Sequence, residues 1–180
     1  MFRLSSNIIF YALVVFLLGY IFGNFLLRKY DESIVKDLEK HQTSFIEDNA
    51  KYSNDTIYRR IPIYISKLDS SAGVTTTFVH KRTGEIVHQY ITIDRGFYFK
   101  YEEYDCMIQA LMYHELGHAI FRYDDIEPIN SDSIKVTNLM WHSIEMGVWW
   151  CFLTEEERDA ELKRFFNGNK IEKCTDEDIQ

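Results

Sequence analysis

Cysteine is scarce in this chain of 180 residues, and its scarcity excludes two classes of protein. The three cysteines, Cys106, Cys151 and Cys174, are too few and too widely spaced for a disulfide framework. No pair has the CxxC spacing of a thiolate metal site. At most one bridge could form, and because free cysteine commonly behaves as a small buried hydrophobe, we expect three ordinary thiols. The cysteines therefore leave the redox compartment open.

Positive charge is also in short supply. Lys and Arg number 20 against 28 Asp and Glu, which gives a net charge of -8, and no Lys/Arg run is interleaved with aromatic residues. This balance excludes nucleic acid as a partner. Hydrophobic residues make up 46% of the chain and aromatic residues 16%, enough to build a packed core. The length suits one domain with an extension.

The longest uncharged stretch lies near the N-terminus, from Ile8 to Leu27, and reads IIFYALVVFLLGYIFGNFLL. As a helix rising about 1.5 Å per residue, it spans the roughly 30 Å hydrocarbon layer of a membrane. A cleaved signal peptide is the alternative, but the apolar run is long for one and no clear small-x-small cleavage site follows. We expect residues 1–29 to form an uncleaved single-pass anchor, followed by a solvated helical stalk over 30–57 and a globular domain over 58–170.

The globular part has the patterns of an α/β fold of the α+β type. Strand signals occur at 61–68, 74–80 and 85–94, the last two on either side of the turn KRTGE. We therefore expect a small sheet, mixed and largely antiparallel.

Helical patterns follow the strands. The first covers 103–122, a polar loop occupies 123–137, and a second helix covers 153–166 with Thr154 as its N-cap. On the first helix, apolar residues at helical spacing predict a stripe that faces the core. These residues are Ile108, Met112, Leu116 and Ala119.

The first helix also carries the motif HELGH, formed by His114, Glu115 and His118. Two histidines four residues apart lie on one face of a helix, where both imidazoles can reach one ion, and Zn²⁺ accepts such nitrogen ligands. Glu115 can touch a zinc-bound water without being a ligand. The competing interpretation is a pair of hydrogen-bonded core histidines. The helix is apolar on both sides, so the histidines point into a poorly solvated cleft, which favours a metal.

The motif resembles the metzincin clan of zinc peptidases, whose pattern is HExxHxxGxxH/D. The resemblance covers roughly residues 60–166: YITIDRGFYF stands where such enzymes carry the substrate-pairing edge strand, and Met140 stands where their Met-turn underlies the metal. It implies a compact zincin domain in which Asp124 is the third zinc ligand, and Glu115 is the general base that activates a water for peptide-bond hydrolysis.

Two departures leave the third ligand open. Phe121 stands where the metzincin pattern has glycine, whose turn conformation is costly for other residues. If the turn starts one residue later, Asp125 becomes the ligand. In a gluzincin arrangement, a glutamate on a second helix completes the site, and Glu145 is then the candidate.

The sequence thus predicts a membrane-anchored zinc metallopeptidase acting on a peptide or protein. Two alternatives remain: a membrane-tethered binding or assembly module whose zinc is structural, and an HExxH hydrolase that cleaves something other than a peptide bond. His80, His88 and His142 have no ligand spacing to their neighbours. Oligomeric state stays open.

Basic residues around the anchor disagree with the expected location of the domain. Only Arg3 precedes the apolar segment, whereas the residues that follow it include Arg28, Lys29, Lys36 and Lys40. Counted by the positive-inside rule, they place the domain in the cytoplasm. A secreted or cell-surface peptidase requires the opposite, and we expect the extracytoplasmic side while keeping both orientations open.

Overall fold

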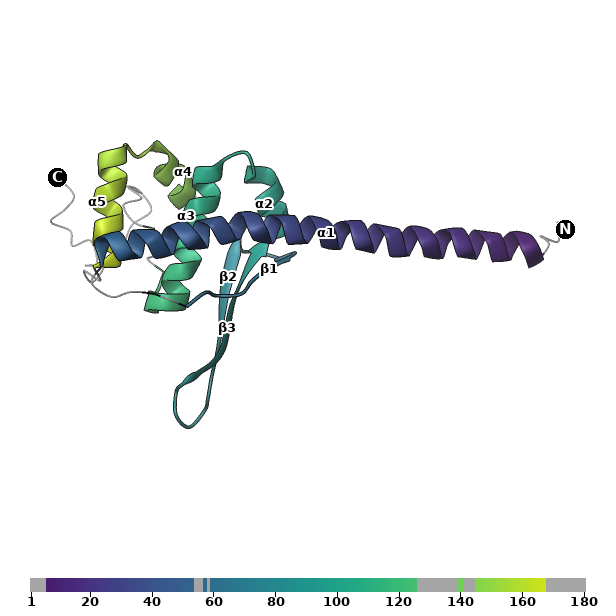
Figure 1. Ribbon diagram of the computed structural model, residues 1–180, viewed down its shortest axis with the longest axis horizontal. Helices are drawn as coiled ribbons and strands as arrows, with labels where there is room; N and C mark the ends of the chain where they lie inside the picture. Colours follow the sequence, from purple (N-terminus) through teal and green to yellow (C-terminus); the bar gives the residue numbers. More distant parts are fainter. Residues whose placement is uncertain (1–5, 54–56, 58, 126–138, 141–144, 168–180) are drawn as a thin grey trace. The chain divides into compact units, whose positions relative to one another are not determined.

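The computed structural model describes residues 6–53, 57, 59–125, 139–140 and 145–167 (Figure 1). It divides into two compact units, Met1–Lys36 and Asp37–Gln180. Helix α1 (Ser6–Tyr52) contributes to both. Within the described residues the fold is mixed α/β, with helices and one small three-stranded sheet.

The first unit consists of the N-terminal part of α1. Its apolar side chains are exposed along the segment that sequence analysis identifies as an anchor, for example Phe16 at 75% and Val15 at 69%. Exposed side chains of this kind on a long helix match the length and composition of a membrane span or a signal anchor.

From Asp37 onward, α1 belongs to the globular unit. Leu38, Gln42, Phe45 and Asn49 recur at helical spacing and are all buried. The Gln42 amide donates a hydrogen bond to the Ile61 carbonyl over 2.9 Å. This part of the 30–57 segment is therefore a packed helix of the domain and not the solvated stalk that its sparse apolar residues suggested.

The sheet contains β1 (Ile63–Ser66), β2 (Gly73–Val79) and β3 (Ile86–Asp94) in the order β1-β3-β2. β1 pairs with β3 in parallel and β2 pairs with β3 in antiparallel fashion, which confirms a small mixed sheet. From Ile91 to Asp94, β3 lies between β1 and β2, so this part of YITIDRGFYF has no free edge for the substrate that the resemblance expects there. The strand at the sheet edge beside the motif helix is β2.

Helices α2 and α3 follow the sheet. α2 (Arg95–Tyr101) is capped by Asp94, whose carboxylate accepts from the Phe97 N–H over 2.7 Å. α3 (Asp105–Leu116) continues into a single π-helical turn, η1 (Gly117–Phe121). The predicted core stripe on this helix is confirmed, since Ile108, Met112, Leu116 and Ala119 are all at most 3% exposed.

The last two described helices are α4 (Glu145–Phe152) and α5 (Glu155–Phe166). The Thr154 N-cap is confirmed by a capping box, in which Thr154 and Glu157 each bond the other's backbone N–H. α5 contributes Phe165 and Phe166 to an aromatic cluster around Phe45 and Tyr113. This cluster joins α1, α3 and α5.

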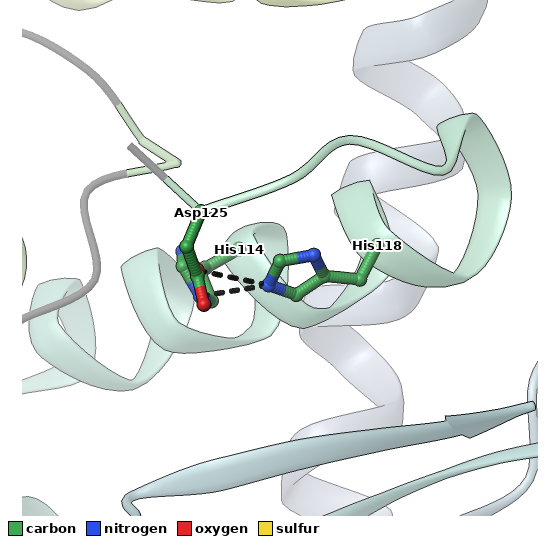
Figure 2. A group of neighbouring side chains, drawn as sticks. All are labelled: His114, His118 and Asp125. Carbon is green, nitrogen blue, oxygen red and sulfur yellow. Dashed lines mark hydrogen bonds and ion pairs between the residues drawn. The ribbon is translucent and has the colours of Figure 1, made fainter. Parts of the chain in front are cut away.

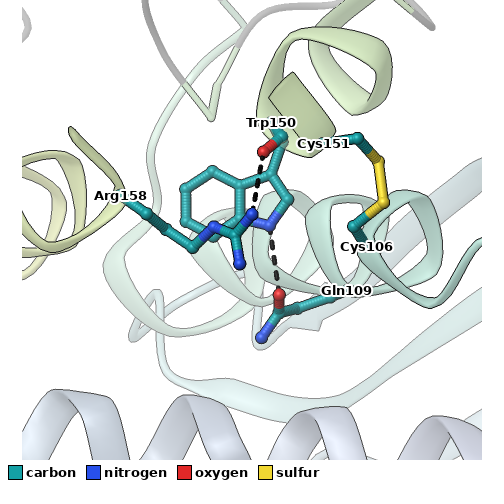
Figure 3. Close-up of a disulfide and its surroundings, with 5 residues drawn as sticks. All are labelled: Cys106, Gln109, Trp150, Cys151 and Arg158. Carbon is teal, nitrogen blue, oxygen red and sulfur yellow. Dashed lines mark hydrogen bonds between the residues drawn. A yellow bond between two sulfur atoms is a disulfide. The ribbon is translucent and has the colours of Figure 1, made fainter. Parts of the chain in front are cut away.

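The expectation of three ordinary thiols is wrong for two of the cysteines. Cys106 in the first turn of α3 and Cys151 in α4 form a disulfide with Cα atoms 5.3 Å apart (Figure 3). Beside it, the Trp150 indole N–H donates to the Gln109 side chain over 3.1 Å. No spacing rule indicates a bridge across 45 residues, because helix packing alone brings the two cysteines together.

Candidate metal centre

Three side chains converge at the C-terminal end of the motif helix. The Nε2 atoms of His114 and His118 lie 3.1 Å apart, and one carboxylate oxygen of Asp125 lies 3.1 and 3.2 Å from them (Figure 2). Each of the three offers one ligand atom to a common point. Among the described residues, this is the one such group of histidine, cysteine and carboxylate side chains.

The spacing of these atoms fits a zinc ion. In a tetrahedral zinc site with bonds of about 2.0–2.1 Å, neighbouring ligand atoms lie roughly 3.3 Å apart. The observed separations of 3.1–3.2 Å are within about 0.2 Å of that value. Two imidazoles and one carboxylate leave a fourth coordination position, which is typical of catalytic rather than structural zinc sites.

Each histidine is held by a backbone carbonyl on the opposite side of its ring. His114 Nδ1 donates to the Leu139 carbonyl over 2.9 Å, and His118 Nδ1 donates to the Tyr123 carbonyl over 2.6 Å. A carbonyl only accepts, so both rings carry a proton on Nδ1. Nε2 of each ring therefore faces the common point, where it can release any proton it carries and bind an ion.

Asp125, and not Asp124, completes the group. The π-turn η1 closes with the Arg122 N–H bonded to the Gly117 carbonyl, five residues earlier, and so uses one residue more than an α-turn. The left-handed turn residue is consequently Arg122, with φ 58° and ψ 36°. Both the turn residue and the carboxylate that completes the group lie one residue later than the metzincin pattern places them. Phe121 is still helical, which explains why glycine is not needed there.

Glu115 lies beside the group but outside it. Its side chain is 3% exposed and faces β2, where the Thr75 hydroxyl donates to its carboxylate over 2.8 Å. A Cβ on Gly73 would lie 2.7 Å from the Glu115 carboxylate, so the strand leaves room for this side chain. Burial raises the pKa of the Glu115 carboxyl, although the charge of His114 and the Thr75 bond oppose the rise.

The charges of the three convergent side chains depend on one another. The hydrogen bond from His114 lowers the pKa of Asp125. Burial by itself lowers the pKa of His114, but the bond to Asp125 and the charge of Glu115 outweigh it and raise the pKa above its ordinary value. These opposite shifts are those of an imidazolium beside a carboxylate, and a divalent cation would replace the proton between them.

A cavity of about 1100 Å³ opens onto this group. Its wall includes the motif side chains His114, Glu115 and His118, the edge strand β2, and the apolar side chains Met107, Leu111 and Met146. The cavity is large enough for several residues of a peptide.

Other candidate residues lie elsewhere. Met140 is fully buried, and its sulfur would lie 2.7 Å from a Cβ on Gly117, which places it against the motif helix. Glu145 is exposed at the start of α4, outside the convergent group. His80 and His88 are exposed at the β2–β3 hairpin, and His142 lies outside the described residues.

Several residues that shape the site carried no sequence signal. Gly73 and Thr75 hold Glu115, and the carbonyls of Leu139 and Tyr123 orient the histidines. Their roles depend on chain segments that meet only in the folded domain.

Fold and site together describe a mixed α/β chain with a long apolar N-terminal helix and a candidate His-His-Asp metal centre. No family model, curated protein or solved structure matches this chain. The resemblance to metzincins therefore stays a prediction from the motif.

Proposed function

We propose that this chain is a zinc-dependent metallopeptidase. The observation that carries the proposal is the convergence of His114, His118 and Asp125, with their ligand atoms 3.1–3.2 Å apart, next to a buried glutamate on the wall of a peptide-sized cavity. The carbonyl bonds to both Nδ1 atoms support it, because they hold both Nε2 atoms towards one carboxylate oxygen, the arrangement that a common ion requires.

Zinc held by His114, His118 and Asp125 would act as a Lewis acid that polarises a peptide carbonyl and acidifies water. Glu115 then acts as the general base: its carboxylate takes a proton from the attacking water and delivers it to the leaving amine. The raised pKa of Glu115 brings it closer to neutral pH, where a carboxyl can both accept and return a proton. Thr75 fixes one carboxylate oxygen and so orients the base.

The substrate in this proposal is an extended peptide segment. β2 is an edge strand on the cavity wall, and its backbone can pair with an extended chain through main-chain hydrogen bonds. This moves the substrate-pairing role from the central β3 to β2. The apolar Met107, Leu111 and Met146 then provide contacts for an apolar side chain near the scissile bond.

We also propose that the globular unit lies on the extracytoplasmic side of a membrane. Support comes from the Cys106–Cys151 disulfide, in which both cysteines are partly exposed. Accessible disulfides persist in oxidising compartments and are reduced in the cytosol. The disulfide outweighs the count of basic residues after the anchor, because that count expresses only a statistical preference over short flanks.

The test uses the full chain purified in detergent. We expect about one zinc per chain by elemental analysis and cleavage of a peptide library that a chelator abolishes. Glu115→Gln should retain zinc and fold while losing turnover by about 100-fold or more. If the chain is instead a membrane-tethered binding module with a structural zinc, Glu115→Gln should leave its binding of partners unchanged. A wild-type chain without zinc would overturn the proposal.

A further inference from the structure

The carbonyl of Ala119 lies at the point where the motif helix ends. Ala119 belongs to η1, whose last residue is Phe121, so its carbonyl is among the last ones of the helix and has no partner further along it. Because Ala119 is 3% exposed, this carbonyl needs a donor from another part of the chain.

Gln89 on β3 supplies that donor. Its amide nitrogen donates to the Ala119 carbonyl over 2.7 Å and to the Thr77 hydroxyl of β2 over 2.8 Å. Both N–H groups are thereby used, and the carbonyl partner fixes which way the amide faces. Gln89 is 2% exposed, and its own carbonyl oxygen is buried without a hydrogen-bond partner. An unsatisfied buried acceptor is costly, so the two bonds on the nitrogen must offset that cost.

The end of the helix determines which carboxylate reaches the histidines. The π-turn adds one residue before the left-handed Arg122, and that extra residue delivers Asp125. A regular α-helical ending would move the turn back and withdraw Asp125 from the two Nε2 atoms. The hydrogen bond from Gln89 connects the π-turn to β3, the central strand of the sheet. The neighbouring strand β2 carries Thr75, which bonds to Glu115.

We propose that Gln89 is a positioning residue for the metal centre: by holding the Ala119 carbonyl, it keeps the motif helix in the π-turned ending that brings Asp125 to His114 and His118. Gln89 touches neither ion nor substrate. The inference rests on the proposed zinc function and concerns a residue that no metal-site motif includes.

The experiment measures zinc affinity of the full chain in detergent, by competition with a chromophoric chelator. Gln89→Met keeps the volume and removes the donor, and we expect zinc affinity to fall by about 10- to 100-fold, the usual effect of losing an outer partner of a metal ligand. Thr77→Val is the matched control, because it removes the other partner of the same amide and leaves the Ala119 bond in place. We expect its zinc affinity to stay within about threefold of wild type.

A double-mutant cycle separates positioning from general destabilisation. In the Asp125→Ala background, Gln89→Met should change zinc affinity by less than about threefold, because the ligand through which Gln89 acts is gone. Equal losses in both backgrounds, or no loss in the single variant, would overturn the inference. If Gln89→Met does not fold, Gln89→Asn takes its place: it keeps the amide but is one carbon too short to reach Ala119, and the same loss is expected.

The outcomes distinguish this inference from the function on which it rests. A wild-type chain that holds no zinc overturns both. A wild-type chain that binds zinc tightly, with Gln89 variants that bind it equally well, overturns only the role of Gln89.

Discussion

Asp124 and Asp125 are adjacent in sequence, yet only Asp125 lies within reach of both histidine Nε2 atoms. We expect Asp125→Ala to weaken zinc binding by more than about 100-fold, since it removes a direct ligand. Asp124 is the exposed neighbouring aspartate, so Asp124→Ala serves as the control. This variant should bind zinc nearly as well as the wild type. Zinc titration of both variants, with Glu145→Ala beside them, tests the assignment, and a large loss at Asp124 alone would restore the original metzincin spacing.

The turn before Asp125 can be tested by stability. Arg122 has a left-handed backbone, so Arg122→Gly removes a cost of about 1 kcal/mol and should leave the fold as stable or slightly more stable. Phe121 is helical and its ring lies 5.2 Å from that of Tyr123 and 5.9 Å from that of Phe165. Phe121→Gly should therefore lose at least about 2 kcal/mol. Chemical denaturation measures the free energy of unfolding of both variants. If Phe121→Gly is the more stable of the two, the left-handed turn residue is Phe121 and not Arg122.

Gly73 matters through the absence of a side chain. A methyl group there would lie 2.7 Å from the Glu115 carboxylate and must displace it. We expect Gly73→Ala to reduce kcat by about 10- to 100-fold through misplacement of the base. Zinc content should stay at the wild-type level, because Glu115 is not a ligand. Val74→Ala is the control on the same strand. If kcat of Gly73→Ala is unchanged, Glu115 is not the general base.

At the scale of elements, the disulfide links the helix that carries both histidines to α4. Closing a loop across 45 residues stabilises a fold by roughly 4 kcal/mol in the chain-entropy account. The double variant Cys106→Ser/Cys151→Ser should lose stability of that order, measured by denaturant unfolding under non-reducing conditions. Cys174→Ser, which removes the remaining cysteine, should unfold like the wild type. If the wild-type chain unfolds identically with and without reductant, the bridge is absent in solution.

Helix α1 has an apolar N-terminal part and a C-terminal part that packs in the globular unit, and its sequence gives no clear boundary between them. Its N-terminal part exposes apolar side chains, whereas from Asp37 it buries Leu38 and Phe45 in the domain. Phe45 contacts rings from α3 and α5, including Tyr113 and Phe166 at 5.1 and 5.0 Å. A truncated chain for solution work must therefore keep the helix from Asp37, since removal of Phe45 would cost about 3–5 kcal/mol.

At the scale of the whole molecule, membrane location and side can be measured together. We expect the chain to sediment with membranes, to resist extraction by high salt or carbonate, and to dissolve in detergent. Protease added outside intact cells should digest the globular unit, and alkylation trapping should find Cys106 and Cys151 oxidised in place. A protected domain with both thiols reduced would instead put the unit in the cytoplasm, as the basic residues after the anchor suggest.

The sequence by itself determined the features that depend on local periodicity. Three features depend only on residues close together in the sequence. They are the apolar segment Ile8–Leu27, the core stripe at helical spacing and the Thr154 cap with its partner Glu157. The same holds for the proximity of His114 and His118, because four residues make one helical turn.

Tertiary structure alone decided which residues complete these local features. Whether the helix ends in a π-turn depends on contacts with the sheet and the aromatic cluster, so the choice of Asp125 over Asp124 could not be read from spacing. The edge position of β2, the burial of α1 from Asp37 and the pairing of Cys106 with Cys151 likewise depend on segments far apart in the chain. Sequence patterns report what lies within one element, whereas packing between elements decides which side chains meet.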